Sequence, residues 1–184
     1  MLNCCPALSN KLVPQIKPHP KSCQYPLINY LVYDQEKLDG LLVGCDLLRV
    51  EPVPGAILLS SRDFTNENSQ KEIIKAIGRQ ETFDVVLSDM APNASGIKSL
   101  DQDRIISLAM KVRDFTLNHG RFGSCLVIKV WQTGSLLTKF TDLLKEDFKD
   151  VQHFKPDASR KDSAEIYIVA CSLINHHFGN LKVK

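Results

Sequence analysis

The stretch that decides the fold is Asp84-Val-Val-Leu-Ser-Asp89-Met-Ala-Pro-Asn93-Ala-Ser-Gly96, an apolar run that stops at a carboxylate and continues into a turn. Pro, Asn and Gly favour turns, so the pattern predicts a strand that ends at Asp89. In doubly wound folds the ligand crevice lies beyond the carboxyl ends of the strands, which is where Asp89 would lie. A strand-ending aspartate is also a common turn residue, so Asp89 needs further support as a site residue.

On both sides of this stretch, short apolar runs alternate with amphipathic patterns. We expect strands at 41–47, 56–59, 84–87, 125–131, 151–154 and 165–172, and helices at 68–79, 102–117 and 135–148. The expected apolar helix faces are Ile73, Ile74 and Ile77; Ile105, Leu108, Ala109, Val112 and Phe115; and Leu136, Phe140, Leu143 and Leu144. The alternation predicts an α/β fold with a mostly parallel sheet. Because residues 155–164 are too few for a crossover helix, the last strand is expected to run antiparallel.

Composition indicates one globular domain, with 43% apolar and 24% charged residues in a chain of 184. Residues 1–40 differ from the rest, since they hold five of the nine prolines and only Leu27 to Tyr33 is apolar enough for a strand. We therefore divide the chain into a loosely ordered arm (1–40), an α/β domain (41–175) and a tail (176–184).

Several classes of protein are disfavoured. No apolar run approaches the roughly 20 residues that cross a bilayer, so no membrane span is expected. The six cysteines form no CxxC pair, and we expect no metal site. A net charge of +2 permits a polyanionic partner without arguing for one.

A dinucleotide-dependent oxidoreductase is disfavoured because no Gly-x-Gly-x-x-Gly follows any strand. The first 33 residues contain no acid, but their prolines and lack of arginine make a weak import signal.

Other charged residues stand at the ends of expected strands. Lys129 interrupts an apolar run, so it either reaches solvent at the strand end or is held as an acid-base group. Glu165 opens the last strand, where a solvated edge is the ordinary alternative. Asp46 and Asp63 follow the first two strands, and a carboxylate there can accept hydrogen bonds from ribose hydroxyls or an adenine amine. Each residue alone is weak support for a site.

As a set, these segments resemble the FtsJ family of RNA 2'-O-ribose methyltransferases, especially its mitochondrial large-subunit ribosomal RNA branch. The resemblance covers about residues 43–173. It rests on Gly44-Cys-Asp46-Leu-Leu, Ser88-Asp89-Met-Ala-Pro-Asn93-Ala-Ser-Gly96, Leu100-Asp-Gln-Asp103-Arg104-Ile-Ile-Ser-Leu108, Lys129-Val-Trp and Lys155-Pro-Asp-Ala-Ser-Arg160-Lys161-Asp-Ser-Ala-Glu165-Ile-Tyr. The run Ser-Asp-Met-Ala-Pro-Asn is highly specific.

The resemblance implies a Rossmann-like, S-adenosylmethionine-dependent methyltransferase sheet that modifies ribosomal RNA of the mitochondrial large subunit. Lys129 would be the catalytic base, positioned by Asp89 and Glu165. The residues that would line the S-adenosylmethionine site are Asp46, Asp63, Phe64 and Asp89. Arg160 and Lys161 match a basic loop that could contact RNA phosphates, although a solvated turn is an equal alternative. The resemblance also implies mitochondrial localisation.

The amino-terminal part of the family pattern has no recognisable counterpart. Family members begin with a helix that carries another catalytic lysine, followed by a strand and a glycine-rich cofactor loop, and none of these is found before Gly44. Leu27 to Tyr33 is too close to Leu41 for a normal parallel crossover. Our hypothesis is a truncated or alternatively spliced form, poorly stable and weakly active or inactive by itself. The alternative is a non-catalytic RNA- or ribosome-associated module that keeps the fold.

Overall fold

The computed structural model describes residues 40–78, 82–132, 134–156 and 163–174. These residues belong to two compact units, which divide between Phe83 and Asp84, and each unit is described by itself. The predicted strand at Leu27 to Tyr33, the amino-terminal arm and the tail from 176 lie outside the described residues. None of the helices in the described part of the chain is long and apolar enough to cross a membrane.

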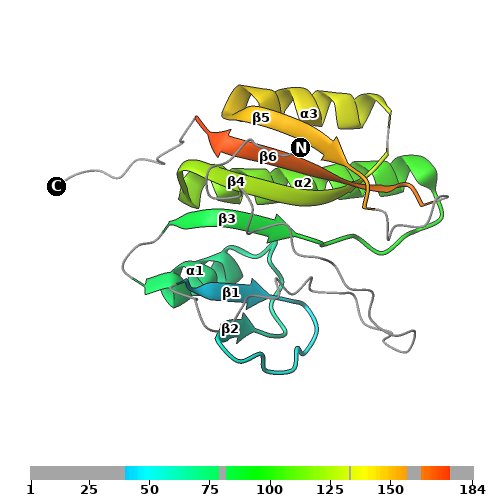
Figure 1. Ribbon diagram of the computed structural model, residues 1–184. Coiled ribbons are helices and arrows are strands. Elements are labelled where there is room, and N and C mark those ends of the chain that lie inside the picture. Colours follow the sequence, from blue (N-terminus) through cyan, green and yellow to red (C-terminus); the bar gives the residue numbers. More distant parts are fainter. Residues whose placement is uncertain (1–39, 79–81, 133, 157–162, 175–184) are drawn as a thin grey trace. The chain divides into compact units, whose positions relative to one another are not determined.

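The carboxy-terminal unit contains a four-stranded sheet with the order β3-β4-β6-β5 (Figure 1). Its strands are β3 (Phe83–Ser88), β4 (Gly120–Trp131), β5 (Phe148–Phe154) and β6 (Glu165–Leu173). The last strand, β6, runs antiparallel to both of its neighbours, as predicted. The helices are α2 (Lys98–His119), which joins β3 to β4, and α3 (Ser135–Asp147), which joins β4 to β5. The alternating pattern of the sequence thus gives the expected mixed α/β sheet.

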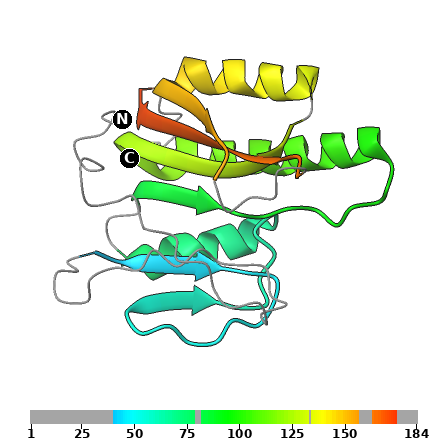
Figure 2. The same cartoon turned by 45° about the vertical axis from the view of Figure 1, so that its right-hand side comes forward.

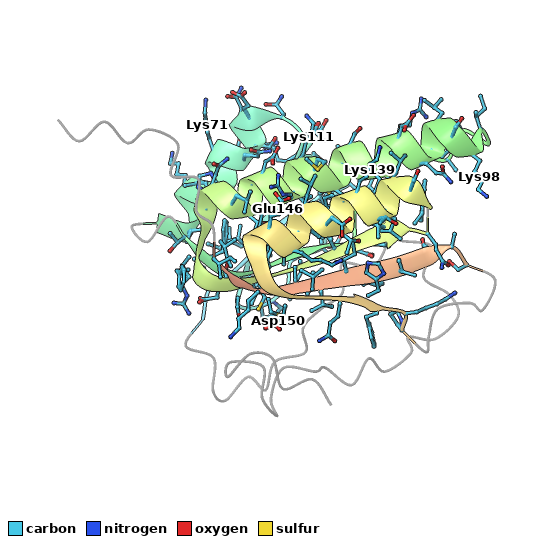
Figure 3. All side chains as sticks on the ribbon, turned by 90° about the horizontal axis from the view of Figure 1, so that it is seen from above. Lys71, Lys98, Lys111, Lys139, Glu146 and Asp150 are labelled. Atoms are coloured by element: carbon cyan, nitrogen blue, oxygen red, sulfur yellow. The ribbon has the colours of Figure 1, made fainter. Side chains whose placement is uncertain are left out.

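The two helices lie side by side over one face of this sheet, with Lys98 and Lys111 on α2 and Lys139 and Glu146 on α3 (Figure 3). Beneath them is the core, which takes alternate residues of the central strands, as the two-residue period of a strand requires. The alternate buried residues are Leu126, Ile128 and Val130 of β4 and Ile166, Ile168 and Ala170 of β6. Cys125 and Cys171 are buried as well and form a separate cluster with Val169. Lys129 and Tyr167 are the intervening, partly exposed residues, so they project from the opposite face.

One predicted helix face is wrong in detail. The buried residues of α3 are Leu137, Phe140, Thr141, Leu144 and Asp147, whereas the predicted Leu136 and Leu143 are only half-buried. The first four have the spacing i, i+3, i+4, i+7, which is one continuous stripe on a helix. Two adjacent leucines left two possible stripes, and packing against the sheet selects the one that includes Leu137.

The amino-terminal unit is a parallel pair of strands, β1 (Leu42–Cys45) and β2 (Ala56–Leu59), with the helix α1 (Glu67–Ile77) lying along them (Figure 2). The helix begins where the Asn66 side chain accepts a hydrogen bond from the Asn68 amide. It ends at Gly78, whose φ of 80° is a backbone conformation that favours glycine. All six strands and three helices predicted from residue 41 onward are therefore present, with shifts at their ends.

Candidate active site

The candidate site is built around an ion pair between two strand ends. Asp89 is the residue directly after β3, and Lys129 lies in the neighbouring strand β4. The Lys129 Nζ lies 3.0 Å from the Asp89 Oδ1, and their side chains are 12% and 24% exposed. A lysine in an apolar strand is costly to bury without a partner. In the structure this ammonium is therefore paired with a carboxylate and largely buried, and its role as an acid-base group stays a prediction.

Tyr167 is a third member of the site that the sequence reasoning missed. It lies directly opposite Lys129 in the antiparallel pairing of β4 and β6, and its hydroxyl donates a 2.7 Å hydrogen bond to the Asp89 Oδ1. The same Asp89 oxygen thus accepts the hydrogen bond from Tyr167 and forms the ion pair with Lys129. The strand period offered a signal, since Tyr167 follows Glu165 by two residues and must share its face.

Glu165 lies on the same face as Lys129 and is half-buried. It is the register partner of Trp131, which is two residues beyond Lys129 on β4. The structure therefore brings the three predicted catalytic residues, Asp89, Lys129 and Glu165, to one end of one sheet face. Lys129 forms its ion pair with Asp89. Glu165 is a near neighbour of Lys129 along the sheet.

The loop after Asp89 is held by Asp101 in the first turn of α2. The Asp101 carboxylate accepts hydrogen bonds from the Ser95 amide at 2.8 Å, the Ser95 hydroxyl at 2.6 Å and the Gly96 amide at 3.2 Å. These bonds, with the Ser95 hydroxyl first, hold the pKa of Asp101 below its usual range. The loop between Asp89 and α2 is consequently anchored at both ends, by the strand and by a buried acid.

The predicted cofactor acids lie in the amino-terminal unit. Asp46 follows β1 and Asp63 lies beyond β2, and the Arg62 amide donates to the Asp46 carbonyl at 2.8 Å. The carboxyl ends of the two parallel strands therefore bring these loops together. Each acid also orders its own loop, since Asp46 accepts from the Leu48 amide and Asp63 from the Thr65 amide.

Two neighbouring side chains add to the description of this unit. Phe64 is buried, and its carbonyl accepts a hydrogen bond from the Gln70 side chain at 3.0 Å. Burial raises the pKa of the Cys45 thiol, and the charges of Asp46 and Asp63 raise it further. Cys45 is therefore an uncharged thiol near neutral pH, which fits a packing role rather than metal binding.

Two other predictions concern different parts of the chain. Arg160 and Lys161 lie outside the described residues, so their proposed contact with RNA stays a prediction. Within residues 40–78, 82–132, 134–156 and 163–174, no group of three or more His, Cys, Asp or Glu side chains could hold a metal ion.

The arrangement defines a class of protein. A mixed α/β fold has an antiparallel last strand, acids follow the ends of parallel strands, and a paired lysine lies beside a strand-ending aspartate. This combination is typical of Rossmann-like methyltransferases, as the sequence predicts. The FtsJ-like methyltransferase family matches residues 28–173, and the chain belongs to this family.

Curated relatives agree with this assignment. The chain is 42% identical over 129 residues to "Ribosomal RNA large subunit methyltransferase E" of Acidiphilium cryptum, a match that covers 70% of this chain and 56% of that protein. It is 40% identical over 131 residues to "rRNA methyltransferase 2, mitochondrial" of Drosophila melanogaster, covering 71% and 52%. The chain thus spans about half the length of these relatives.

A solved structure supports the fold. The crystal structure described as a ribosomal RNA methyltransferase from Plasmodium falciparum matches with a TM-score of 0.64 and 23% identity, covering 73% of each chain. At this level of identity the match concerns the fold, which agrees with the mixed sheet of the carboxy-terminal unit and the expected fold class.

Proposed function

We propose that this domain transfers a methyl group from S-adenosylmethionine to a ribose 2'-hydroxyl of ribosomal RNA. The observation that carries the proposal is the Lys129 ammonium, largely buried and 3.0 Å from the Asp89 carboxylate at the end of β3. A paired lysine at a strand end is suited to proton transfer, because its partner holds it in one place. Family membership supplies the reaction class.

In the proposed reaction, residues of this chain accept one proton, that of the ribose 2'-hydroxyl. Before the step, the Lys129 ammonium releases one proton to solvent. The resulting amine accepts the proton of the 2'-hydroxyl at Nζ while the 2'-oxygen forms a bond to the methyl carbon. S-adenosylmethionine, when bound, supplies a sulfonium methyl group whose bond to sulfur breaks in the same step. The products are the 2'-O-methyl ribose, S-adenosylhomocysteine and the Lys129 ammonium. Asp89 then stabilises that ammonium, and Tyr167 keeps the carboxylate in position.

The acids of the amino-terminal unit are chemically suited to bind the ribose and adenine of S-adenosylmethionine. Asp46 and Asp63 follow neighbouring parallel strands, and a carboxylate has about four lone-pair sites, more than the loop contacts of Asp46 use. We assign Asp46 to the ribose hydroxyls and Asp63, with Phe64 beside it, to the adenine end. Asp89 would face the methyl group. Glu165 would position Lys129 from the same sheet face.

The names of the relatives support a proposal for the substrate and for the compartment. Proteins named for ribosomal RNA of the large subunit suggest that RNA as the partner, with Arg160 and Lys161 contacting its phosphates. The mitochondrial relative suggests mitochondrial localisation. Expression of the full-length protein with a carboxy-terminal fluorescent tag tests the compartment, and diffuse cytosolic fluorescence would contradict it.

The direct test of the reaction uses large-subunit ribosomal RNA transcribed without modifications and S-adenosylmethionine labelled in its methyl group. The expected result is label in a dinucleotide that resists alkaline hydrolysis, because a 2'-O-methyl group blocks cleavage at that position. Label on a base, or none in a folded chain that binds RNA, would contradict the proposed reaction. The second outcome would favour the non-catalytic RNA-associated module.

A further inference from the structure

Phe154 occupies the same row of the sheet as the Lys129 site. It lies opposite Tyr167 in the pairing of β5 and β6, and Tyr167 lies opposite Lys129 in the pairing of β6 and β4. Directly opposed side chains on neighbouring strands project from the same face. With strands about 4.8 Å apart, the backbones of Phe154 and Lys129 are about 10 Å apart.

A second observation confirms which face carries the ring. The preceding residue, His153, forms a 2.9 Å hydrogen bond with the Thr141 hydroxyl of α3, so it projects toward the helices. Successive strand residues alternate, and Phe154 therefore projects away from α2 and α3. Its side chain is 48% exposed. A large aromatic ring is thus presented on the face that also carries Lys129, Tyr167 and Glu165.

We propose that Phe154 is a stacking platform for a base of the RNA strand whose ribose is methylated at Lys129. Exposed aromatic rings bind unpaired bases by stacking, in a way that tolerates any base. A separation of about 10 Å brings the base of the target nucleotide, or of its immediate neighbour, within reach of the ring. This inference rests on the proposed function, because it requires an RNA ribose at Lys129.

The surroundings of the ring favour RNA over an apolar protein surface. Lys155 follows Phe154 directly and is exposed, and its Nζ donates a 2.9 Å hydrogen bond to the Ser163 carbonyl. Cations that neutralise phosphates next to an aromatic ring that stacks a base are the usual pair of features in single-strand binding. The face is also continuous with the candidate active site, so one ligand can contact both.

The test measures binding of a short, fluorescently labelled single-stranded RNA of mixed sequence by fluorescence anisotropy. Phe154→Ala should weaken binding about 5- to 150-fold, the range expected for loss of one stacked base. Phe154→Trp keeps an aromatic ring and should bind like the unsubstituted chain. The slope of log affinity against log salt concentration should not change in Phe154→Ala, because no phosphate contact is removed.

Phe122→Ala is the matched control. Phe122 is 70% exposed on the same sheet, but it lies seven residues before Lys129 along β4, or about 23 Å away. Its removal should leave RNA affinity unchanged. An equal loss in both alanine variants would show a non-specific effect of exposed rings and would overturn the assignment of Phe154.

Failure of this inference can be separated from failure of the proposed function. Unchanged affinity in Phe154→Ala, or no recovery in Phe154→Trp, in a chain that methylates RNA would overturn the stacking platform and leave the reaction intact. A folded chain that neither binds RNA nor transfers methyl groups would overturn both. Circular dichroism of each variant shows that the sheet is retained.

Discussion

The two units of the chain differ in how well they can sustain their own structure. The carboxy-terminal unit has four strands, with β4 spanning 12 residues and β6 spanning nine. The amino-terminal unit has two strands of four residues each. Among the residues that the structure describes, Phe64 and Ile73 are the only buried apolar side chains of the amino-terminal unit, while its Leu41, Leu42, Leu47, Leu48 and Ile57 are exposed.

The difference separates two tasks. The residues that would act on the RNA ribose lie on a packed four-stranded sheet; they are Lys129, Asp89 and Tyr167. Asp46 and Asp63, which would hold the cofactor, are on a two-stranded sheet, and sheets of this size are marginal by themselves. We expect the residues that act on the RNA ribose to be preorganised. Affinity for S-adenosylmethionine should depend on the less stable, amino-terminal unit.

The largest expected effect is the loss of methyl transfer when the proposed base, Lys129, is replaced. Lys129→Met should lower methyl transfer by about 10²- to 10⁴-fold, the usual contribution of a general base, while S-adenosylmethionine affinity stays nearly unchanged. Lys139→Met is the control, because Lys139 is exposed on α3 and should have no effect. Turnover by Lys129→Met equal to that of the control would remove Lys129 from the role of base.

The next effect concerns the stability of the carboxy-terminal unit. The Arg113 Nε donates to the Asp147 Oδ2 at 2.6 Å, and both side chains are largely buried. Asp147→Ala leaves the Arg113 charge without this partner and should cost about 3–5 kcal/mol. Urea denaturation followed by circular dichroism measures the loss.

Asp142→Ala provides the comparison for that variant. Asp142 pairs with Lys145, and both are exposed, so its removal should cost less than about 1 kcal/mol. Similar losses in the two variants would mean that the Arg113 pair does not stabilise the packing of α2 and α3.

A smaller effect is expected on the cofactor side. Asp46→Ala or Asp63→Ala should weaken S-adenosylmethionine binding about 10- to 150-fold, as expected for hydrogen bonds that involve a charged group. The urea unfolding of the carboxy-terminal unit should not change. Equilibrium dialysis against labelled cofactor makes the measurement. Glu51→Ala, an exposed acid of the same unit, should bind normally, and an equal loss there would indicate a general charge effect.

The smallest effect is a pH dependence at Asp101. Its pKa lies below the ordinary 3.8 because the bonds from Ser95 and Gly96 favour the charged form. The stabilisation is therefore complete above pH 3.8 and is lost as the pH falls through the lowered pKa of the folded state. Wild type should exceed Asp101→Asn in melting temperature near neutral pH, and the gap should close in acid. A gap that widens in acid would contradict this assignment.

Much of this architecture could be predicted from the sequence because strand and helix periods are local properties. The six strands and three helices from residue 41 onward needed only the spacing of apolar residues. The distance between Asp89 and Lys129 could not be predicted, since it depends on β3 lying beside β4 across the whole of α2. The hydrogen bond from Tyr167 to Asp89 joins residues 78 positions apart, so the period of β6 could place Tyr167 beside Glu165 but could not predict this contact.

The start of α2 shows another limit of pattern reading. The helix was predicted from residue 102 but begins at Lys98. Its first turn contains Asp101, whose carboxylate is held by Ser95 and Gly96 from the preceding loop. A contact between a helix and the loop before it leaves no periodic signal, so neither the early start nor the anchored loop could be predicted.

The central claim is that this chain uses S-adenosylmethionine, and calorimetric titration of the purified chain with that cofactor tests it most directly. Circular dichroism first establishes that the chain is folded. We expect saturable binding of one equivalent, weakened in Asp46→Ala and retained in Lys129→Met. A folded chain with no detectable binding would contradict the methyl-transfer proposal and would leave a non-catalytic RNA-associated role for the fold.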